Sequence, residues 1–578
     1  MIEPRKTVRN ARPYSIPGEV RARKIRLDKN ENGLGCSPQV LAALKNITSE
    51  DVSMYPEYPA LMNKLSTYWN IPAQNIFLAN AGDEAISYIV ETYIEEGDKV
   101  IIPVPTFSMF EILFKNGGAN IKEILYHDNF SFPTQGVLDA ITENVKAIVI
   151  VSPNSPTGSS ITRQDLIKIL NAAPNALIVF DETYSHYTGE TAIDLINDFP
   201  HLFILKTFSK IFGLAGLRLG NIISKAENII NLNKVRLPYC VNSLAVIAGC
   251  TALDDQEFVD HVLLTTRQEK TFLHERLDKL GIQTIKTDTN FILARFGKWR
   301  ELVYTRLKER DILVRDMDEY PLLDGFLRIS VGTRQQHRMF LEALTEILPP
   351  EALFFDMDGV LVDVSNSYRI AIKNTAEYFL DEEVSLAEIQ EFKDRGGYNN
   401  DWDCTEAIIR MHGEQAARTE IIEQFQRLYR GNNFNGLITN EKWLLHKDVL
   451  DKLKADYKLG IVTGRPRAEA EYVLTKFSMK NYFDIVVAME DVPDEKLKPD
   501  PFGLNLAMKK LNVRRAAYLG DTVDDIKAAR SAGAIPIGVI PPSDDGGQLY
   551  QLFQQHGAKH ILGSVNEISE VVDENWSC

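Results

Sequence analysis

Residues 207–220, TFSKIFGLAGLRLG, place one lysine beside hydroxyl side chains and ahead of an arginine. Lys210 follows Thr207 and Ser209, and Arg218 comes eight residues after the lysine. A lysine amine can form a Schiff base with the aldehyde of pyridoxal phosphate, while hydroxyl groups and an arginine can bind the phosphate of that cofactor. The spacing therefore indicates a lysine that carries this cofactor.

Other groups that the same cofactor needs occur earlier in the chain. Asp181 and Tyr184 follow an apolar run, where a carboxylate can pair with the ring nitrogen and a phenol can bond to the ring hydroxyl. The segment NAGDEAI, residues 80–86, predicts a glycine turn that opens a helix, and helix N-termini bind phosphate groups. Asn154, in SPNSPTG, is a second candidate for the ring hydroxyl.

A second group of acidic residues lies in FFDMDGVLVD, residues 354–363. Asp356 and Asp358 are two residues apart, so their side chains point the same way if the segment is extended. One carboxylate can attack phosphorus, and the other can protonate the leaving oxygen and then activate water. Such a crowded anionic site needs Mg²⁺. Later residues that can complete it are Thr463 in IVTGRP, Lys498 in LKPDP, and Asp521 and Asp525 in GDTVDD.

The elements that must position these residues are predicted to be parallel strands. Short apolar runs end in polar residues at KAIVIVSPN, ALIVFDE, LFILKTFSK, FFDMDG, LGIVTGRP and AAYLGDTVDD. Ligands bind at the C-terminal ends of strands in such α/β sheets. The sequence therefore predicts an α/β fold throughout.

Two domains are expected, because 578 residues exceed what one hydrophobic core organises. RISVGT, residues 328–333, predicts a late strand that is followed by a helix to about Leu348. Pro349 and Pro350 end that helix. The predicted domains are residues 1–348 and 351–578, and the mostly helical stretch of about 364–447 is a separate cap.

The composition excludes several classes of protein. A net charge of −16 without a basic run argues against nucleic-acid binding. No apolar run is long enough to span a bilayer or to resemble a signal peptide. Five widely separated cysteines indicate reduced thiols, and the scattered histidines lack ligand spacing. We predict a cytoplasmic protein that binds neither membranes nor nucleic acid.

Taken in order, the motifs from about residue 8 to 348 resemble those of the fold-type I, pyridoxal-phosphate-dependent aminotransferases of class I/II. Within these, the chain is most similar to the histidinol-phosphate aminotransferase group. The resemblance implies a large domain with a mainly parallel sheet and a small α+β domain. The motifs are LDKNENGLGCSP, MYPEYP, NAGDEAI, VPTFSMF, SPNSPTG, VFDETYSHY, TFSKIFGLAGLRLG, KVRLPY, NFILARF and LRISVGT.

The resemblance also implies roles for single residues. Lys210 binds the cofactor and moves a proton between the substrate Cα and the cofactor C4′, and Asp181 keeps the ring nitrogen protonated. Phe107 stacks on the ring, and Tyr184 and Asn154 bond to its hydroxyl, although the family more often has asparagine where this chain has Ser155. The residues implied to bind the cofactor phosphate are Ala81, Gly82, Asp83, Thr207, Ser209 and Arg218, with Tyr55 from the second subunit of a homodimer.

Substrate binding in this group implies an arginine that receives anions. Arg328 matches the arginine for the substrate carboxylate, and the substrate phosphate reaches the same place with help from Tyr14 and Arg315. A guanidinium fork suits both anions. The amino donor implied by the resemblance is glutamate.

Residues 351–578 resemble the haloacid dehalogenase-like hydrolases, which implies a Rossmann-like domain with a helical cap. Asp356 is then the nucleophile and Asp358 the general acid/base. The cap loop around Asp401 and Trp402 is expected to reach the substrate. The remaining implied roles are phosphoryl binding by Thr463 and Lys498, and Mg²⁺ binding by Asp356, the Asp358 backbone carbonyl and Asp521. Asp525 is implied to be a metal ligand through water or to orient Lys498.

Together the two halves predict a bifunctional enzyme of histidine biosynthesis. Imidazole-acetol phosphate would receive an amino group from glutamate, and the histidinol phosphate formed would be hydrolysed to histidinol. An aminotransferase for another acid fused to an unrelated phosphatase remains an alternative, as does a phosphate-binding decarboxylase of the same fold. A pyridoxal-phosphate-binding regulator without turnover, or a second domain that only binds, is a further alternative.

Overall fold

The structure is a computed structural model that describes residues 2–9, 20–394, 400–544 and 546–576. Contacts divide the chain into two compact units, Met1–Ile347 and Leu348–Ser577. The predicted boundary between residues 348 and 351 lies beside this division. Each unit has an α/β fold with β-sheets and helices, as the sequence predicts.

The first unit is built around a seven-stranded sheet in the order β2-β8-β7-β6-β5-β3-β4. All neighbouring strands run parallel except β8, which is antiparallel to β2 and β7. The predicted strands KAIVIV, ALIVFD and LFILKT are β5, β6 and β7, and this prediction is confirmed. The bounds are β2 (Ile76–Ala79), β3 (Lys99–Val104), β4 (Asn120–Leu125), β5 (Val145–Val151), β6 (Leu177–Asp181), β7 (Leu202–Thr207) and β8 (Gly220–Ile223).

Helices cover both faces of this sheet, which explains why β5 is apolar at nearly every position. Val149 packs in one core with helices α5 and α6, whereas Ile148 packs in a second core with α7 and α8. Successive strand residues point to opposite faces, so each face receives alternate side chains. The helices of this unit are α1 (Lys6–Arg9), α2 (Pro38–Lys45), α3 (Ser49–Ser53), α4 (Pro59–Trp69), α5 (Ala81–Tyr93), α6 (Ser108–Gly117), α7 (Thr134–Ala140), α8 (Arg163–Ala172), α9 (Ala226–Leu232), α10 (Ser243–Asp254), α11 (Gln256–Lys279), α12 (Arg300–Glu309) and α13 (Arg334–Ile347).

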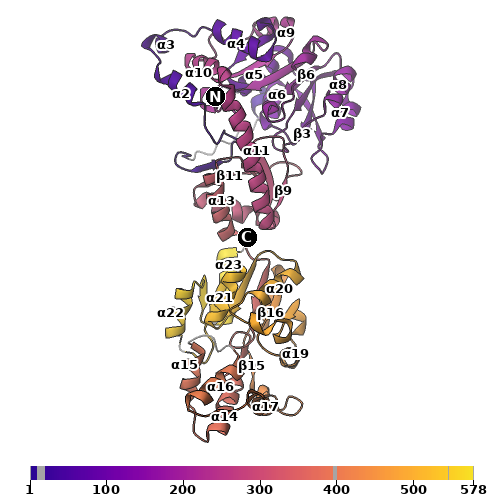
Figure 1. Ribbon diagram of the computed structural model, residues 1–578. Coiled ribbons are helices and arrows are strands. Elements are labelled where there is room, and N and C mark those ends of the chain that lie inside the picture. The colour runs from indigo at the N-terminus through magenta and orange to yellow at the C-terminus, as the bar shows by residue number, and fades with distance from the viewer. Residues whose placement is uncertain (1, 10–19, 395–399, 545, 577–578) are drawn as a thin grey trace. The chain divides into compact units, whose positions relative to one another are not determined.

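A smaller five-stranded sheet, in the order β1-β11-β12-β10-β9, completes the first unit. The long helix α11 runs from the large sheet to β9, as Figure 1 shows. RISVGT begins within β12 and α13 follows it, as predicted. The bounds are β1 (Ile25–Leu27), β9 (Gln283–Ile285), β10 (Phe291–Arg295), β11 (Ile312–Asp316) and β12 (Phe326–Ser330).

The second unit has a six-stranded parallel sheet in the order β17-β16-β13-β18-β19-β20. The three predicted strands are β13, β16 and β18, which lie side by side at its centre. Sequence reasoning did not identify β17, β19 and β20. The strand bounds are β13 (Ala352–Phe355), β16 (Lys458–Val462), β17 (Ile485–Val487), β18 (Ala516–Gly520), β19 (Ile535–Val539) and β20 (His560–Leu562). The helices are α18 (Lys447–Asp456), α19 (Arg467–Lys476), α20 (Phe502–Leu511), α21 (Val523–Ala532), α22 (Gly547–His556) and α23 (Ile568–Trp576).

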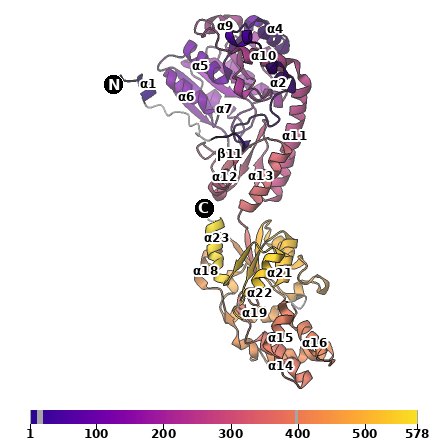
Figure 2. The same cartoon turned by 90° about the vertical axis from the view of Figure 1, so that its left-hand side faces the viewer.

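A group of helices between β13 and β16 forms the cap of this unit. They gather at one end of the unit in Figure 2. A two-stranded antiparallel ribbon, β14 (Val362–Asp363) with β15 (Lys442–Trp443), links them to the central sheet. The cap helices are α14 (Tyr368–Leu380), α15 (Leu386–Asp394), α16 (Asp401–Met411) and α17 (Arg418–Tyr429).

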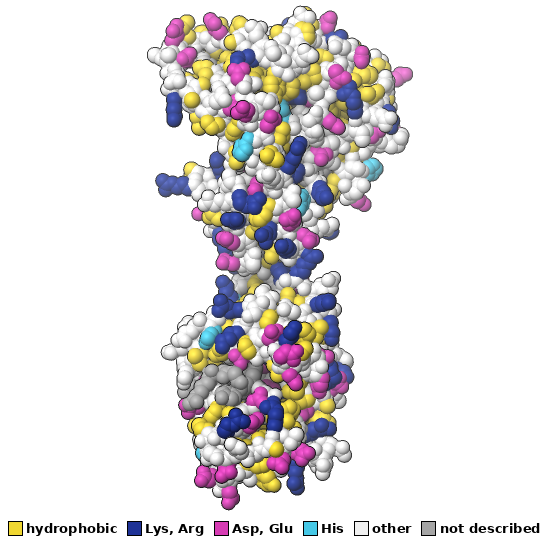
Figure 3. All heavy atoms as spheres, in the orientation of Figure 1, with side chains coloured by type: hydrophobic (Ala, Val, Ile, Leu, Met, Phe, Trp, Pro, Cys, Tyr) yellow, Lys and Arg dark blue, Asp and Glu magenta, His cyan; other side chains and the backbone are white. Residues whose placement is uncertain are grey.

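Acidic and basic side chains are interspersed on the face of the molecule shown in Figure 3. Within the described ranges, no helix combines the length and apolar character that a bilayer span requires. The cysteines in those ranges, Cys36, Cys240, Cys250 and Cys404, form no disulfide, and Cys578 lies outside them.

Candidate active sites

The first unit has a cavity of about 330 Å³ at the C-terminal ends of the central strands of its large sheet. The polar residues that follow β6 and β7 meet there because the strands are parallel neighbours. Of the predicted residues, the cavity is lined by Ala81, Gly82, Asp83, Phe107, Asp181, Tyr184, Thr207, Ser209, Lys210, Arg218, Arg315 and Arg328.

Lys210 and Asp181 present opposite charges to this cavity. Lys210 Nζ donates a hydrogen bond of 2.9 Å to the backbone carbonyl of Lys29. Asp181 is buried at the end of β6 and accepts a hydrogen bond of 2.8 Å from the Thr183 backbone N–H. Burial raises the pKa of Asp181 above its usual value, although hydrogen bonding from Thr183 opposes this shift. Among the described residues no cation pairs with Asp181, so the carboxylate fits a positively charged group in the cavity.

The first turn of α5 offers backbone N–H groups to the cavity wall. Ala81 has a φ of 70° just where the strand β2 turns into the helix, and Gly82 adds no side chain that would shield the backbone. Arg218 Nη2 lies 2.7 Å from the Asp83 carboxylate. Thr207 Oγ1, at the end of β7, lies 3.0 Å from Ser209 Oγ. These groups form a cradle whose donors suit a phosphate.

Two arginines reach the cavity from the small sheet. Arg315 on β11 and Arg328 on β12 are register partners on antiparallel neighbouring strands. Arg328 donates to Ser155 Oγ at 3.0 Å and to the Asp28 carbonyl at 2.9 Å. The two guanidinium groups give this end of the cavity the character of an anion site.

Asn154 does not line the cavity, whereas Ser155 does. The Asn154 side chain is completely buried, where its amide nitrogen donates to the Pro105 carbonyl at 2.9 Å and to Thr157 Oγ1 at 2.8 Å. Its amide oxygen accepts from Thr106 Oγ1 at 2.7 Å. The amide is therefore engaged in holding its own loop, and the predicted contact between Asn154 and a cofactor does not fit this arrangement.

Tyr55 and Tyr14 lie apart from the cavity for different reasons. Tyr55 is 75% exposed and its ring stacks on Tyr239 with 4.3 Å between the ring centroids. Tyr14 lies outside the described residues, so its predicted role stays a prediction.

Sequence reasoning missed the contribution of residues 28–31, which line the same cavity. Asn30 donates a hydrogen bond of 2.8 Å to the Tyr184 hydroxyl, and its own backbone N–H donates to Ser330 Oγ at 2.8 Å. Asn30 therefore orients Tyr184 and joins the two sheets of the first unit. Its positive φ of 55° is a conformation that asparagine adopts more readily than most residues.

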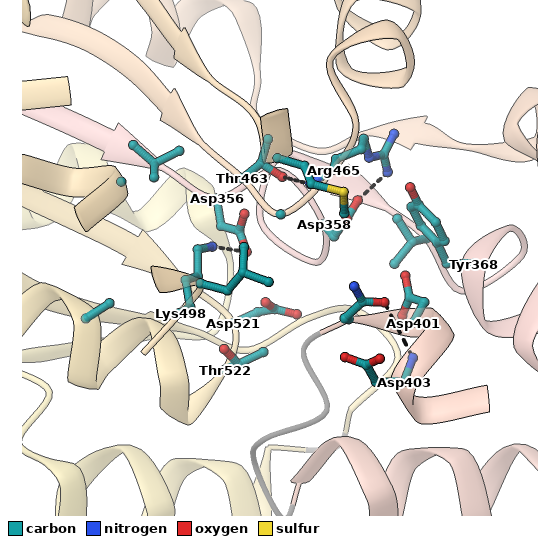
Figure 4. A pocket seen from close by; sticks show the side chains of 18 of the residues that line it. Asp356, Asp358, Tyr368, Asp401, Asp403, Thr463, Arg465, Lys498, Asp521 and Thr522 are labelled. Carbon is teal, nitrogen blue, oxygen red and sulfur yellow. Dashed lines mark hydrogen bonds and ion pairs between the residues drawn. The ribbon is translucent and has the colours of Figure 1, made fainter. Parts of the chain in front are cut away.

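The second unit has a cavity of about 310 Å³ between the C-terminal ends of β13, β16 and β18 and the cap. Figure 4 shows Asp356, Thr463, Lys498 and Asp521 directed toward its centre. Lys498 Nζ lies 3.0 Å from Asp356 and 2.8 Å from Asp525. Burial raises the pKa of Asp356 to about 7, although Lys498 favours the charged form.

Asp356, Asp521 and Asp525 each place a carboxylate oxygen within 4.8 Å of the other two. Burial and repulsion from Asp525 raise the pKa of Asp521 well above its usual value. Gly359 makes this close approach possible, because a Cβ at its position would lie 2.0 Å from Asp521 Oδ2. Three close carboxylates, of which those of Asp356 and Asp525 are buried, fit a divalent cation, and their oxygens are the ligands that Mg²⁺ prefers.

The Asp358 side chain lies apart from this carboxylate cluster. Figure 4 shows its carboxylate turned toward Arg465 and Tyr368, on the cap side of the cavity. The resemblance predicts that Asp358 contacts the metal through its backbone carbonyl. Such a contact would leave the side chain available for acid/base chemistry.

The cap contributes Asp401, Trp402 and Asp403 to the cavity wall at the start of α16. Asn400 caps this helix by accepting a hydrogen bond of 2.9 Å from the Trp402 N–H. Residues 395–399 of the predicted cap loop lie outside the described part of the chain.

Two families match the chain over separate ranges. Residues 22–344 match the family described as aminotransferase class I and II, and residues 353–539 match the haloacid dehalogenase-like hydrolases. The two ranges contain all of the cavity-lining catalytic candidates described above.

Histidinol-phosphate aminotransferases are among the proteins similar to this chain. A histidinol-phosphate aminotransferase of Symbiobacterium thermophilum is 34% identical over 363 residues, covering 60% of this chain and 99% of the relative. One from Thermoanaerobacter pseudethanolicus is 34% identical over 348 residues, covering 59% and 97%.

Solved structures that are similar to this chain include histidinol-phosphate aminotransferases. The histidinol-phosphate aminotransferase of Clostridium acetobutylicum has a TM-score of 0.52 at 25% identity, covering 55% of this chain and 98% of that one. The Sinorhizobium meliloti enzyme in complex with pyridoxal-5'-phosphate has a TM-score of 0.53 at 23% identity, covering 56% and 89%.

Proposed function

The chain belongs to the class I and II aminotransferases over residues 22–344 and carries a haloacid dehalogenase-like hydrolase domain over residues 353–539, and from this premise we propose two successive activities. The first is transfer of an amino group from glutamate to imidazole-acetol phosphate. The second is hydrolysis of the resulting histidinol phosphate to histidinol and phosphate.

The aminotransferase proposal rests on relatives named histidinol-phosphate aminotransferase that match nearly their whole length, together with the charges around the first cavity. Pyridoxal phosphate bound there would supply an acceptor for the electron pair of the substrate Cα–H bond. Lys210 would hold the cofactor and then carry the proton from Cα. Asp181 would keep the proton on the ring nitrogen. The cradle between α5 and Arg218 would hold the phosphate.

Phe107 and Tyr184 would contact opposite parts of the cofactor ring. Phe107 is the N-cap residue of α6 and lines the cavity, and Tyr184 has its hydroxyl fixed by Asn30. In place of Asn154, we assign Ser155 to the neighbourhood of the ring hydroxyl, because Ser155 is the residue of this loop that lines the cavity.

Arg328 would bind the glutamate carboxylate, and Arg315 beside it would help to bind the phosphate of the second substrate. The proposal rests on their register pairing and their place in one cavity. Because each substrate leaves before the other binds in such a transfer, one anion site can serve both.

The aminotransferase unit is proposed to act as a homodimer. Tyr55 and Tyr239 expose 75% and 50% of their surface, although aromatic side chains of this size are usually covered. A second subunit that covers them would bring Tyr55 to the partner's cofactor phosphate. Light scattering of the full chain tests this, and a monomer with full activity would contradict it.

The phosphatase proposal rests on the arrangement of Asp356, Lys498 and Asp521 in one cavity. Mg²⁺ held by Asp356, Asp521 and the Asp358 backbone carbonyl would offset the negative charge there, while Asp525 would orient Lys498. Asp356 would attack phosphorus as the ester P–O bond breaks, and Asp358 would give its proton to the leaving oxygen. Water would then lose a proton to Asp358 and release phosphate from Asp356.

One experiment tests both halves of the proposed function. The purified chain is given imidazole-acetol phosphate and glutamate with Mg²⁺, and 2-oxoglutarate, histidinol phosphate, histidinol and free phosphate are followed over time. We expect histidinol phosphate to rise and then fall as phosphate appears. Accumulation of histidinol phosphate without phosphate release would remove the second activity and leave the first.

A further inference from the structure

Arg465 is a fully buried arginine beside the second cavity, two residues after Thr463. Its guanidinium pairs with two acids: Nη2 bonds to Asp358 Oδ1, and Nη1 donates to Glu441 Oε2 at 3.0 Å. A buried charge is costly unless it is paired and hydrogen-bonded. The pairing of Arg465 therefore fixes its position firmly relative to both acids.

Glu441, the second partner of Arg465, is itself held by residues of the cap and of the segment that joins the cap to the central sheet. Glu441, which precedes β15, accepts hydrogen bonds of 2.9 Å from Ser367 Oγ and from the Tyr429 hydroxyl. The Arg465 guanidinium lies 4.9 Å from the centre of the Tyr368 ring, a distance at which a cation and an aromatic ring attract each other. Tyr368 in turn stacks on Tyr429, with 4.1 Å between the ring centroids.

Asp358 is placed differently from its two neighbours in this cluster. About 31% of its side chain is exposed, whereas the side chains of Arg465 and Glu441 are completely buried. Arg465 holds the Oδ1 atom, so Oδ2 is the oxygen that remains for proton transfer into the cavity. A general acid must stay within hydrogen-bond reach of the leaving oxygen, and a freely rotating carboxylate satisfies this only part of the time.

We propose that Arg465 is the positioning residue for Asp358: it holds the carboxylate so that Oδ2 faces the leaving group, and Glu441 holds Arg465 in turn. This inference rests on the proposed phosphatase activity. The step it assists breaks the ester P–O bond, forms a bond from Asp356 to phosphorus, and moves one proton from Asp358 to the leaving oxygen. Arg465 takes no part in bond making.

Two esters whose leaving groups differ in their need for a proton can distinguish whether Arg465 positions Asp358 or only supports the structure. Glycerol 2-phosphate releases an alkoxide that needs a proton, whereas p-nitrophenyl phosphate releases a phenolate that does not. In Arg465→Lys the charge stays and the two-pronged fork is lost. Single-turnover phosphorylation of Asp356 should slow by about tenfold or more with glycerol 2-phosphate, because general acid catalysis contributes about that much or more, and change little with p-nitrophenyl phosphate.

A second variant and a control complete the experiment. Glu441→Gln keeps Arg465 but weakens its support, so it should show the same selective loss to a smaller extent. Glu469→Gln changes another buried acid of the cluster, which bonds to Tyr368 at 2.7 Å, and should slow both esters equally or not at all.

The outcomes separate the inference from the proposed function. Equal loss with both esters in a folded Arg465→Lys protein, checked by thermal unfolding, would overturn the positioning role while leaving the phosphatase intact. If the wild-type protein hydrolyses neither ester nor histidinol phosphate, both the proposed phosphatase activity and this inference are wrong.

Discussion

Arg315 and Arg328 lie directly opposite each other on the antiparallel strands β11 and β12, and both line the cavity that contains Lys210. Two guanidinium groups at one end of a cavity repel each other, and an anion bound between them would offset this repulsion. The pair is therefore our proposed site for a substrate carboxylate or phosphate, and this suggests the first prediction.

Arg328→Ala should weaken both glutamate and the phosphorylated substrate, because one anion site is proposed for both. Loss of a buried charge partner commonly costs about 2–5 kcal/mol. Half-reactions measured separately with each substrate check this. If only one substrate is affected, Arg328 does not serve both, and Arg315→Ala then tests whether Arg315 binds the other.

Lys210→Ala should abolish transamination and the visible absorbance of lysine-bound cofactor, while phosphate release from histidinol phosphate continues. Borohydride reduction followed by peptide mass spectrometry measures which lysine carries the cofactor. Lys29→Ala is the matched control, because Lys29 lines the same cavity. A reducible cofactor linkage that persists in Lys210→Ala would show that another lysine carries it.

Asp181→Asn should stabilise the protein without cofactor and slow proton abstraction from the substrate severely. Burial raises the pKa of Asp181, so the unfolded chain loses this proton at a lower pH than the folded chain does. Above the unfolded pKa, the buried charge therefore destabilises the folded state, and the penalty grows as pH rises through the folded pKa. Asparagine removes this penalty but cannot hold the ring proton.

Thermal unfolding at neutral pH, with and without pyridoxal phosphate, measures the first effect of Asp181→Asn. The variant should unfold at a higher temperature than wild type without cofactor and gain less when cofactor is added. Near-normal single-turnover rates in the variant would contradict the proposed contact between Asp181 and the ring nitrogen.

Asp356→Asn should stop phosphate release and leave transamination unchanged, because an amide is a poor nucleophile and the metal site loses a charged ligand. Removal of Mg²⁺ by a chelator should have the same selective effect. Asp363→Asn, in β14 nearby, is the control and should retain phosphate release. Wild-type hydrolysis of histidinol phosphate no faster than that of unrelated phosphomonoesters would argue against the coupled pathway.

Replacing Asp401 and Trp402 together with alanine should raise KM for histidinol phosphate more than KM for a generic phosphate ester. Both residues line the cavity at the start of α16, where a carboxylate can attract the substrate's cationic groups and an indole can stack on an imidazole. Steady-state kinetics with the two esters measures the difference. Equal changes would mean that this part of the cap closes the site without recognising the substrate.

The sequence by itself determined the two α/β domains and the strand ends where polar residues gather. Asp181 and Asp356 were found because each follows an apolar run, and parallel strands bring such residues to one edge of a sheet. The apolar run that predicts a buried strand is local, so residues such as these can be located without the rest of the fold.

Only the tertiary structure decided which side of a loop faces a cavity and which distant residues meet. Asn154 and Ser155 are adjacent and both buried, yet only Ser155 of the two lines the cavity. Asp358, Glu441 and Arg465 come from three separate segments and form one ionic cluster. Their pairing depends on how β13, β16 and the β14–β15 ribbon pack together, because charges so far apart in the chain carry no local pattern that predicts contact.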